Sequence, residues 1–472
     1  MKRRDFLKAS ALVGATAILG GCAKNGATSG EPNQTPAQEN ASSDASSSET
    51  AEANRPASGG TGSPYDGVFP QHEPYGRGVG LVPGRVVWAY GPETVRWDGQ
   101  GWWWAPENFD EAGVQAMVDE GIAALAGSQD ASSGWKALFE AFNKSHGRTG
   151  AYSPGQKIAV KVNINGSGVF GDDDSGETTM DYTNPVVLKC LLRSMVEDAG
   201  IAPEDITVYD ISRLFPRYMV QMCTEGALAG VRFVGRDAVE ADMSAPIVWS
   251  QGFSGAQNYL PTCVTEADYL VNLASLKGHS YGITLSAKNH FGSFWNGNTL
   301  RPPEGARLHG FVSGARMGSY TPLVDLLSTE QLGAKTILYM LDGLICAPSE
   351  GANITFENSQ WQQTPFNGGF TASLLFSQDA LAIDSVGADL LMNEPAVTER
   401  NGALRGNVGV ESYLHEGALA ETGEAPSGTD YAIDGHDVSN LGVHEHWNNS
   451  TDKLYSRNLG KNEGIELVRI GF

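Results

Sequence analysis

Residues 157–164 read Lys157-Ile158-Ala159-Val160-Lys161-Val162-Asn163-Ile164. The β-branched and apolar residues of this stretch predict a strand in a sheet that is buried on both faces. Alternate residues of a strand share a face, so Lys161 and Asn163 are expected to point the same way near the end of the strand. The stretch begins the part of the chain that decides the fold.

Strand-like and helix-like segments alternate from residue 156 to residue 392. Further strands are expected at residues 206–210, 232–234, 269–273, 283–288, 336–341 and 371–376. Helices are expected at residues 185–199, 217–229 and 379–392, the first with Pro185 in its first turn and Gly200 at its end. This alternation predicts an α/β fold, with a mixed, largely parallel sheet flanked by helices. Ligands of such sheets usually bind beyond the carboxyl ends of the strands.

Two segments flank this expected α/β core. Residues 71–155 contain a tryptophan-rich segment and helices, one of which Asn108 could cap and which would run to about Leu125. The tryptophans, Trp97, Trp102, Trp103 and Trp104, either pack a loop onto the domain or form a sugar-stacking platform. Residues 393–472 are expected to form an irregular, β-rich C-terminal extension packed on the core, with a last strand at 466–470.

The first 22 residues have the pattern of an export signal. A basic start that contains Arg3 and Arg4 is followed by an uncharged segment, which is too short to cross a membrane as a helix. The run Arg3-Arg4-Asp5-Phe6-Leu7-Lys8 resembles a twin-arginine signal, which implies the twin-arginine translocase as a partner during export. Leu19-Gly20-Gly21-Cys22 resembles a lipobox, and the sequence leaves two outcomes open, acylation of Cys22 or cleavage without a lipid.

Residues 23–70 are rich in Ser, Ala, Glu, Thr and Pro and are expected to be a disordered linker. With a lipid on Cys22, the linker would hold the globular body away from a membrane. The sequence therefore predicts an extracytoplasmic protein, in the periplasm or on the outer cell surface, that is anchored to a membrane by lipidated Cys22.

Charge and cysteine spacing exclude several classes of function. A formal net charge of -23 disfavours non-specific binding of nucleic acid, so no nucleic-acid partner is expected. The cysteines that follow Cys22 are far apart and include no C-x-x-C pair; they are Cys190, Cys223, Cys263 and Cys346. An iron-sulfur cluster and a local zinc site are therefore not expected. The sequence leaves open whether these four cysteines are buried free thiols or include a single disulfide.

Lys161, Lys277 and Lys288 lie inside or next to the predicted apolar strands. They need partners, because burying an unpaired ammonium is costly. One interpretation is an internal ion-pair network with Asp210, Asp342 and Asp384. The other is an anion-binding pocket, and the two can coexist. The residues of that pocket would be Lys161, Lys277, Lys288, Asn163 and Asn289.

Several residues are candidates for acid-base chemistry or metal binding. His279, His290 and Lys288 are the candidate catalytic residues, since imidazole titrates near neutral pH. Asp342 or Asp384 would orient them or hold a divalent metal. His444 and His446 would share one face of a strand, a spacing that suits zinc or another metal that prefers imidazole, although structural histidines explain it too.

Four motifs carry a resemblance to a known family. They are Val160-Lys161-Val162-Asn163, Leu276-Lys277-Gly278-His279, Lys288-Asn289-His290-Phe291-Gly292 and Asp379-Ala380-Leu381-Ala382-Ile383-Asp384. In this order they resemble the motifs of Domain of Unknown Function family 362, over residues 157–392. The resemblance implies a shared fold and pocket but no settled reaction. Several relatives carry ferredoxin-like cysteine clusters, which this chain lacks, so no iron-sulfur role is transferred.

Two hypotheses of function follow. In the first, the chain is an exported enzyme that binds a small anionic substrate through Lys, Asn and His residues at the strand ends. In the second, it is a non-catalytic ligand- or metal-binding factor, or an assembly factor, of the cell envelope. The sequence contains no G-x-S-x-G, Walker A or G-x-G-x-x-G motif that would favour catalysis.

Overall fold

An eight-stranded sheet forms the centre of the structure, which is a computed structural model of the chain. The structure describes residues 69–168, 173–251, 257–280, 282–295, 308–312, 316–404, 408–433 and 436–471. Across the sheet the strand order is β18-β2-β14-β11-β8-β3-β4-β5. The strands are β2 Arg85–Tyr90, β3 Ile158–Lys161, β4 Ile206–Tyr209, β5 Arg232–Val234, β8 Tyr269–Ser275, β11 Thr336–Gly343, β14 Ser373–Ser377 and β18 Glu466–Ile470.

All strands of this sheet run in one direction except β14, which is antiparallel to both its neighbours. The expected largely parallel, mixed α/β sheet is therefore confirmed. The carboxyl ends of β3, β4, β8 and β11 lie at the same edge, so Lys161, Asp210, Ser275 and Asp342 come close to one another in the fold.

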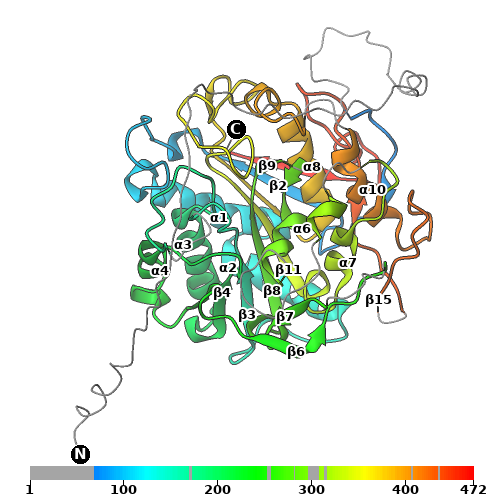
Figure 1. Cartoon of the computed structure of the whole chain (residues 1–472), viewed down its shortest axis with the longest axis horizontal. Helices are drawn as coiled ribbons and strands as arrows, with labels where there is room; N and C mark the ends of the chain where they lie inside the picture. Colours follow the sequence, from blue (N-terminus) through cyan, green and yellow to red (C-terminus); the bar gives the residue numbers. More distant parts are fainter. Residues whose placement is uncertain are drawn as a thin grey trace, which may run out of the picture. The chain divides into compact units, whose positions relative to one another are not determined.

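Helices cover both faces of the sheet (Figure 1). On one face pack α1 Glu111–Ala126, α2 Ala131–Ser145 and α3 Pro185–Arg193, against residues such as Val160 and Val208. On the other face pack α6 Ser286–Asn289, α7 Pro322–Ser328, α8 Ala380–Met392 and α10 Ser412–Leu419. Because side chains alternate along β3, Val160 faces the first layer and Ala159 the second.

Local sequence explains where most of these helices begin. At the start of α3, the Asn184 side chain accepts a hydrogen bond from the Val186 amide, and Pro185 occupies the first turn. At the start of α8, the Asp379 side chain accepts a hydrogen bond from the Ala382 amide. For α1 the prediction was wrong. Asn108 ends a 3-10 turn and donates its side-chain amide to the Trp102 carbonyl, and α1 begins after Asp110 instead.

Three other segments differ from the prediction. Residues 283–288, predicted as a strand, divide between β10 Gly282–Thr284, which pairs with β9 Lys277–His279, and helix α6. The helix predicted at 217–229 ends early, as α4 Arg217–Met222, and a 3-10 turn Gly226–Leu228 follows. The helix predicted at 185–199 is α3 followed by a π-helical turn Ser194–Asp198, and Gly200 ends it with a positive φ of 68°.

Both flanking segments contribute strands to the main sheet, β2 from residues 71–155 and β18 from residues 393–472. A two-residue ladder joins the same segments again, between β1 Tyr75–Gly76 and β17 Val443–His444. The other short elements are β6 Ala241–Pro246 with β7 Tyr259–Pro261, β12 Gln360–Trp361 with β13 Gly369–Phe370, β15 Ala432–Ile433 with β16 His436–Asp437, and the turns α5 Thr262–Thr265 and α9 Pro395–Thr398.

Trp97, Trp103 and Trp104 are buried, as expected if they pack the loop onto the domain, while Trp102 is partly exposed. The four cysteines at positions 190, 223, 263 and 346 are free thiols in the structure. Among the described helices, none has the length and apolar character needed to span a bilayer. Cys22, Arg3 and Arg4 lie outside the described residues.

Candidate functional site

A cavity of about 520 Å³ lies beyond the carboxyl ends of β3, β4 and β8. Asn163 follows β3, Asp210 follows β4 and Lys277 follows Ser275 of β8, so three neighbouring strands each supply part of its wall. Other residues that line the cavity are Asn165, Ser212, Arg213, His279, Thr284, Lys288, Asn289, Phe291, His309 and Glu350. This is the edge of a parallel sheet at which ligands usually bind.

Lys161 lies behind the cavity wall, fully buried, with its charge satisfied internally. Its Nζ is 3.1 Å from Asp210 Oδ2 and donates hydrogen bonds to the Val162 carbonyl and the Asn289 side-chain oxygen. Burial lowers the pKa of Lys161, and the Asp210 carboxylate opposes that effect. The ion-pair interpretation therefore describes Lys161, with the partner Asp210 that it named.

Lys277 is also fully buried and has a partner that the sequence did not indicate. Its Nζ is 3.5 Å from Asp181 Oδ1, 2.8 Å from the Asp181 carbonyl oxygen and 3.4 Å from Asn163 Oδ1. Asp342, one of the three carboxylates considered as lysine partners from the sequence, accepts hydrogen bonds from the Asn184 and Leu344 amides. Burial, with the neighbouring Asp181, raises the pKa of Asp342 to about 7.

Lys288 differs from the other two lysines, although it also lines the cavity. Its Nζ lies 4.1 Å from the centre of the Phe291 ring, a cation–π contact. Within the described part of the chain, no carboxylate forms an ion pair with it and no acceptor forms a hydrogen bond with it. The pKa of Lys288 is lowered to about 7, mainly by burial. The Glu350 carboxylate opposes this shift, and the charges of Lys277 and Lys161 add to it. Lys288 thus borders the cavity as an ammonium group that has no ion-pair partner among the described residues.

Asp384 fixes the short helix that carries Lys288. Its carboxylate accepts hydrogen bonds from the Ser286 amide (2.9 Å), the Ala287 amide (3.0 Å) and the Ser286 hydroxyl (2.7 Å), which are the first donors of α6. Burial raises the pKa of Asp384 to about 6. A carboxylate from helix α8 therefore starts α6 and positions Lys288, which is the orienting role that the sequence offered as an alternative to metal binding.

The two histidines predicted from the sequence occupy different places. His279 lines the cavity, with Nδ1 3.7 Å from Glu350 Oε1, and burial lowers its pKa well below the ordinary value. His290 is fully buried between Asn272 and Ser293, each 3.2 Å from one ring nitrogen, and is not among the residues that line the cavity. Burial lowers the pKa of His290 to about 3, so its ring is neutral near pH 7.

Asp342 and Asp384 belong to no group of three or more potential metal ligands among the described residues. His444 and His446 do belong to such groups. The other members are His72, Glu411 and His415.

Residues 158–389 match the family model of Domain of unknown function (DUF362), and residues 1–20 match that of the twin-arginine translocation pathway signal sequence. We call this matched stretch the DUF362 domain. Lys161, Lys277, Lys288 and Asp384 all lie within the DUF362 domain, whereas His72, Glu411 and His444 lie outside it. The signal match shows that the chain is exported by the twin-arginine route. No curated protein matches the chain.

The polar groups that face the cavity of the DUF362 domain can bind a small anion. Asp210 and Asp181 pair with Lys161 and Lys277, whereas the Lys288 ammonium has no ion-pair partner among the described residues. The Asn163 side chain adds a neutral amide to the same wall, whereas the Asn289 amide is engaged by Lys161, Asn272 and the Leu273 carbonyl. A lysine with a pKa near 7 can also transfer a proton or act as a nucleophile at neutral pH.

Sequence reasoning missed several residues of the wall, notably Arg213, His309 and Glu350. Arg213 follows the Asp210 that ends a strand, and this adjacency was the available signal. His309 begins a three-residue 3-10 turn and Glu350 lies in a loop, and neither segment is long enough to show a periodic pattern that indicates the direction of a side chain.

Proposed function

We propose that this exported chain binds a small anion in the cavity of its DUF362 domain, with the Lys288 ammonium as the main charged contact. The observation that supports this most is the contrast among the three lysines at the cavity, of which Lys161 and Lys277 are buried and Lys288 is half-buried. Lys161 and Lys277 have carboxylate partners, and Lys288 has none among the described residues. Withdrawing a cation from water without a counterion is costly, and a bound anion would reduce that cost for the half-buried Lys288.

The test is a sulfate titration at pH 6 and pH 8, followed by calorimetry. Sulfate keeps its charge over this range, whereas Lys288, with its pKa of about 7, is mostly charged at pH 6 and mostly neutral at pH 8. Sulfate is therefore expected to bind about tenfold more weakly at pH 8, since each pH unit above a pKa lowers the charged fraction about tenfold. Binding of equal strength at both pH values would contradict the role of Lys288.

The effect of Lys288 on sulfate binding must be distinguished from the effects of other groups near the cavity that titrate in the same pH range. Burial lowers the pKa of His309 to about 4 and that of His279 well below its ordinary value, so neither titrates between pH 6 and pH 8. Asp342, with a pKa of about 7, gains negative charge in the same range. The Lys288→Met variant is the control, since any pH dependence that it retains comes from Asp342.

We further propose that a lipid on Cys22 anchors the exported chain to a membrane. The basis is the lipobox-like sequence 19–22 behind a signal that matches at residues 1–20. In cells, Cys22→Ser is expected to move the protein from the membrane fraction to the soluble fraction, with a mass that lacks the acyl chains. A Cys22→Ser variant that stays in the membrane fraction at the wild-type level would exclude this anchor.

Catalysis on the bound anion is a second candidate, which the pKa of Lys288 favours, because an acid-base group is most effective when its pKa lies near the working pH. His279, which also faces the cavity, would then serve as a neutral donor or acceptor. His290, hydrogen-bonded behind the wall, would position Asn272. Chemical turnover of the ligand recovered with the protein would distinguish an enzyme from a binding protein.

A further inference from the structure

We propose that His72, His415, His444 and Glu411 bind a divalent transition-metal ion of the zinc class at a site outside the DUF362 domain. The ligand atoms of His72, His444 and His446 lie within 4.8 Å of one another, and so do those of Glu411, His415 and His444. The two groups share His444. The ring centres of His72 and His415 lie 5.0 Å and 4.6 Å from that of His444, so the imidazoles surround a small common space.

Three ring nitrogens in this space form no hydrogen bond with any described residue, although two of them lie 3.5 Å and 3.7 Å from the Glu411 carboxylate. The Nε2 atoms of His72, His415 and His444 are buried, and among the described residues none has a hydrogen-bond partner. His444 is fully buried, and a polar atom in that position normally has a partner. Three such atoms in one cluster indicate a ligand that accepts lone pairs, which is the chemistry of a metal ion.

The opposite nitrogens of two of these rings carry the ring proton. His72 Nδ1 is 2.7 Å from the Glu73 carbonyl oxygen, which can only accept. His444 Nδ1 is 2.8 Å from Ser385 Oγ, which itself donates to the Leu381 carbonyl at 2.6 Å and therefore accepts from the histidine. With the proton on Nδ1, each Nε2 presents a lone pair to the cluster. Ligand histidines in metal sites are oriented by such hydrogen bonds.

His446 acts as a positioning residue in this site. Its Nδ1 is 2.7 Å from Asp389 Oδ1 and its Nε2 is 2.5 Å from Glu411 Oε2, so carboxylates occupy both nitrogens. His446 thereby holds the Glu411 carboxylate beside His444 and His415, from whose Nε2 atoms it lies 3.7 Å and 3.5 Å away. Three imidazoles and one carboxylate are a donor set that zinc and related ions accept.

The ligands come from three separate segments of the chain. His72 precedes β1, His444 lies in β17, which pairs with β1 at Tyr75, and His415 lies in α10. The Phe69 ring stacks on His446, with ring centres 4.4 Å apart and planes 9° apart. A metal ion bound here would therefore link the segment that follows residue 68 to the C-terminal part of the chain.

The test uses full-length protein purified without added metal, treated with chelator and titrated with Zn²⁺ or Co²⁺. One equivalent is expected to bind, and cobalt is expected to give a visible absorption spectrum of low symmetry. His72→Gln and His415→Gln change half-buried residues and are each expected to weaken binding by at least about tenfold, the lower end of the losses seen when the surroundings of a metal ligand change. His146→Gln is the matched control, because His146 bonds to the Phe142 and Ala334 carbonyls and lies outside the cluster.

Thermal unfolding and limited proteolysis provide readouts that separate metal binding from a folding defect. In chelator, wild type and both variants are expected to unfold at similar temperatures, and Zn²⁺ is expected to raise the unfolding temperature of wild type and His146→Gln alone. Zn²⁺ is also expected to protect residues 69–76 of wild type from proteolysis. The proposal is overturned if wild type binds no zinc, or if it binds zinc no more tightly than His72→Gln and His415→Gln.

Discussion

Replacing Lys161 by methionine is expected to lower the free energy of unfolding by about 3 to 5 kcal/mol, the usual cost of removing one partner of a buried ion pair. The substitution leaves Asp210 without its cation, in a site where both side chains are almost fully buried. Asp210 would keep its hydrogen bonds from the Ser212 and Ile164 amides, which do not neutralise its charge. Lys161 is therefore predicted to be a structural residue.

The measurement is equilibrium unfolding in urea, with Lys288→Met as the matched variant. Both changes remove an ammonium from the same region, but Lys288 has no carboxylate partner among the described residues, and its loss is expected to leave stability unchanged or to increase it. Equal destabilisation by the two substitutions would mean that Lys288 has a structural counterion, and the anion pocket would lose its main support.

Lys288→Met is expected to weaken the binding of the anionic ligand by about a hundredfold. Hydrogen bonds to charged groups contribute about 1.5 to 3 kcal/mol, and each 1.4 kcal/mol is about tenfold in affinity. The larger figure applies because the Lys288 ammonium lines a cavity and lacks competing acceptors among the described residues. Calorimetric titration with sulfate at pH 6 measures the loss.

Lys136→Met is the control for this comparison. Lys136 lies on the exposed side of α2, 4.0 Å from Glu140, and is not among the residues that line the cavity. Its loss changes the net charge by the same amount and is expected to leave sulfate affinity within about twofold of wild type, because solvent screens exposed charges. A similar loss of affinity in both variants would assign the effect to net charge instead of the cavity.

The sheet could be predicted from sequence because its strands are buried on both faces and consist of continuous apolar runs. β3, β8 and β11 have burial patterns without an exposed position, and each was expected. Helix α6 was not expected, since Ile283 and Thr284 favour a strand and the helix is too short to show a period. Its first donors bond to Asp384, which is distant in the sequence, so tertiary contact decides its conformation.

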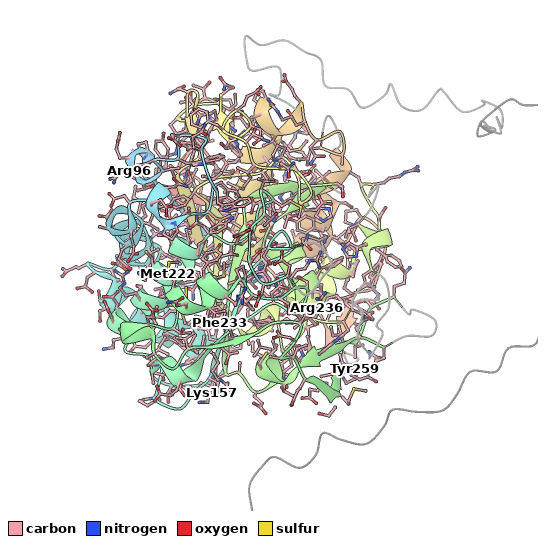
Figure 2. All side chains as sticks on the ribbon, turned by 60° about the vertical axis from the view of Figure 1, so that its left-hand side comes forward. Arg96, Lys157, Met222, Phe233, Arg236 and Tyr259 are labelled. Carbon is pink, nitrogen blue, oxygen red and sulfur yellow. The ribbon has the colours of Figure 1, made fainter. Side chains whose placement is uncertain are left out.

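The carboxylate partners of the lysines could also be predicted from the sequence only in part. Asp210 could be predicted because it directly follows a strand that neighbours β3, so the topology places it beside Lys161. Asp181 could not, because it lies in an irregular segment before α3. Lys157, at the lower edge of Figure 2 near the start of β3, pairs with Asp205 at the opposite end of the strand from the cavity.

Helix α8 connects the two proposed sites. Asp384 holds the turn that carries Lys288, Ser385 accepts from His444, and Asp389 accepts from His446. These contacts come from within six residues of one buried helix.

The most direct test of the account is the small-molecule content of protein purified under native conditions after its own export. Native mass spectrometry would compare wild type with Lys288→Met, and Lys136→Met would serve as the control. The account predicts one anionic small molecule per chain in wild type and in Lys136→Met, and its loss from Lys288→Met while the variant remains folded. Wild-type protein that carries no anion and binds none when titrated, or equal occupancy in all three proteins, would contradict it.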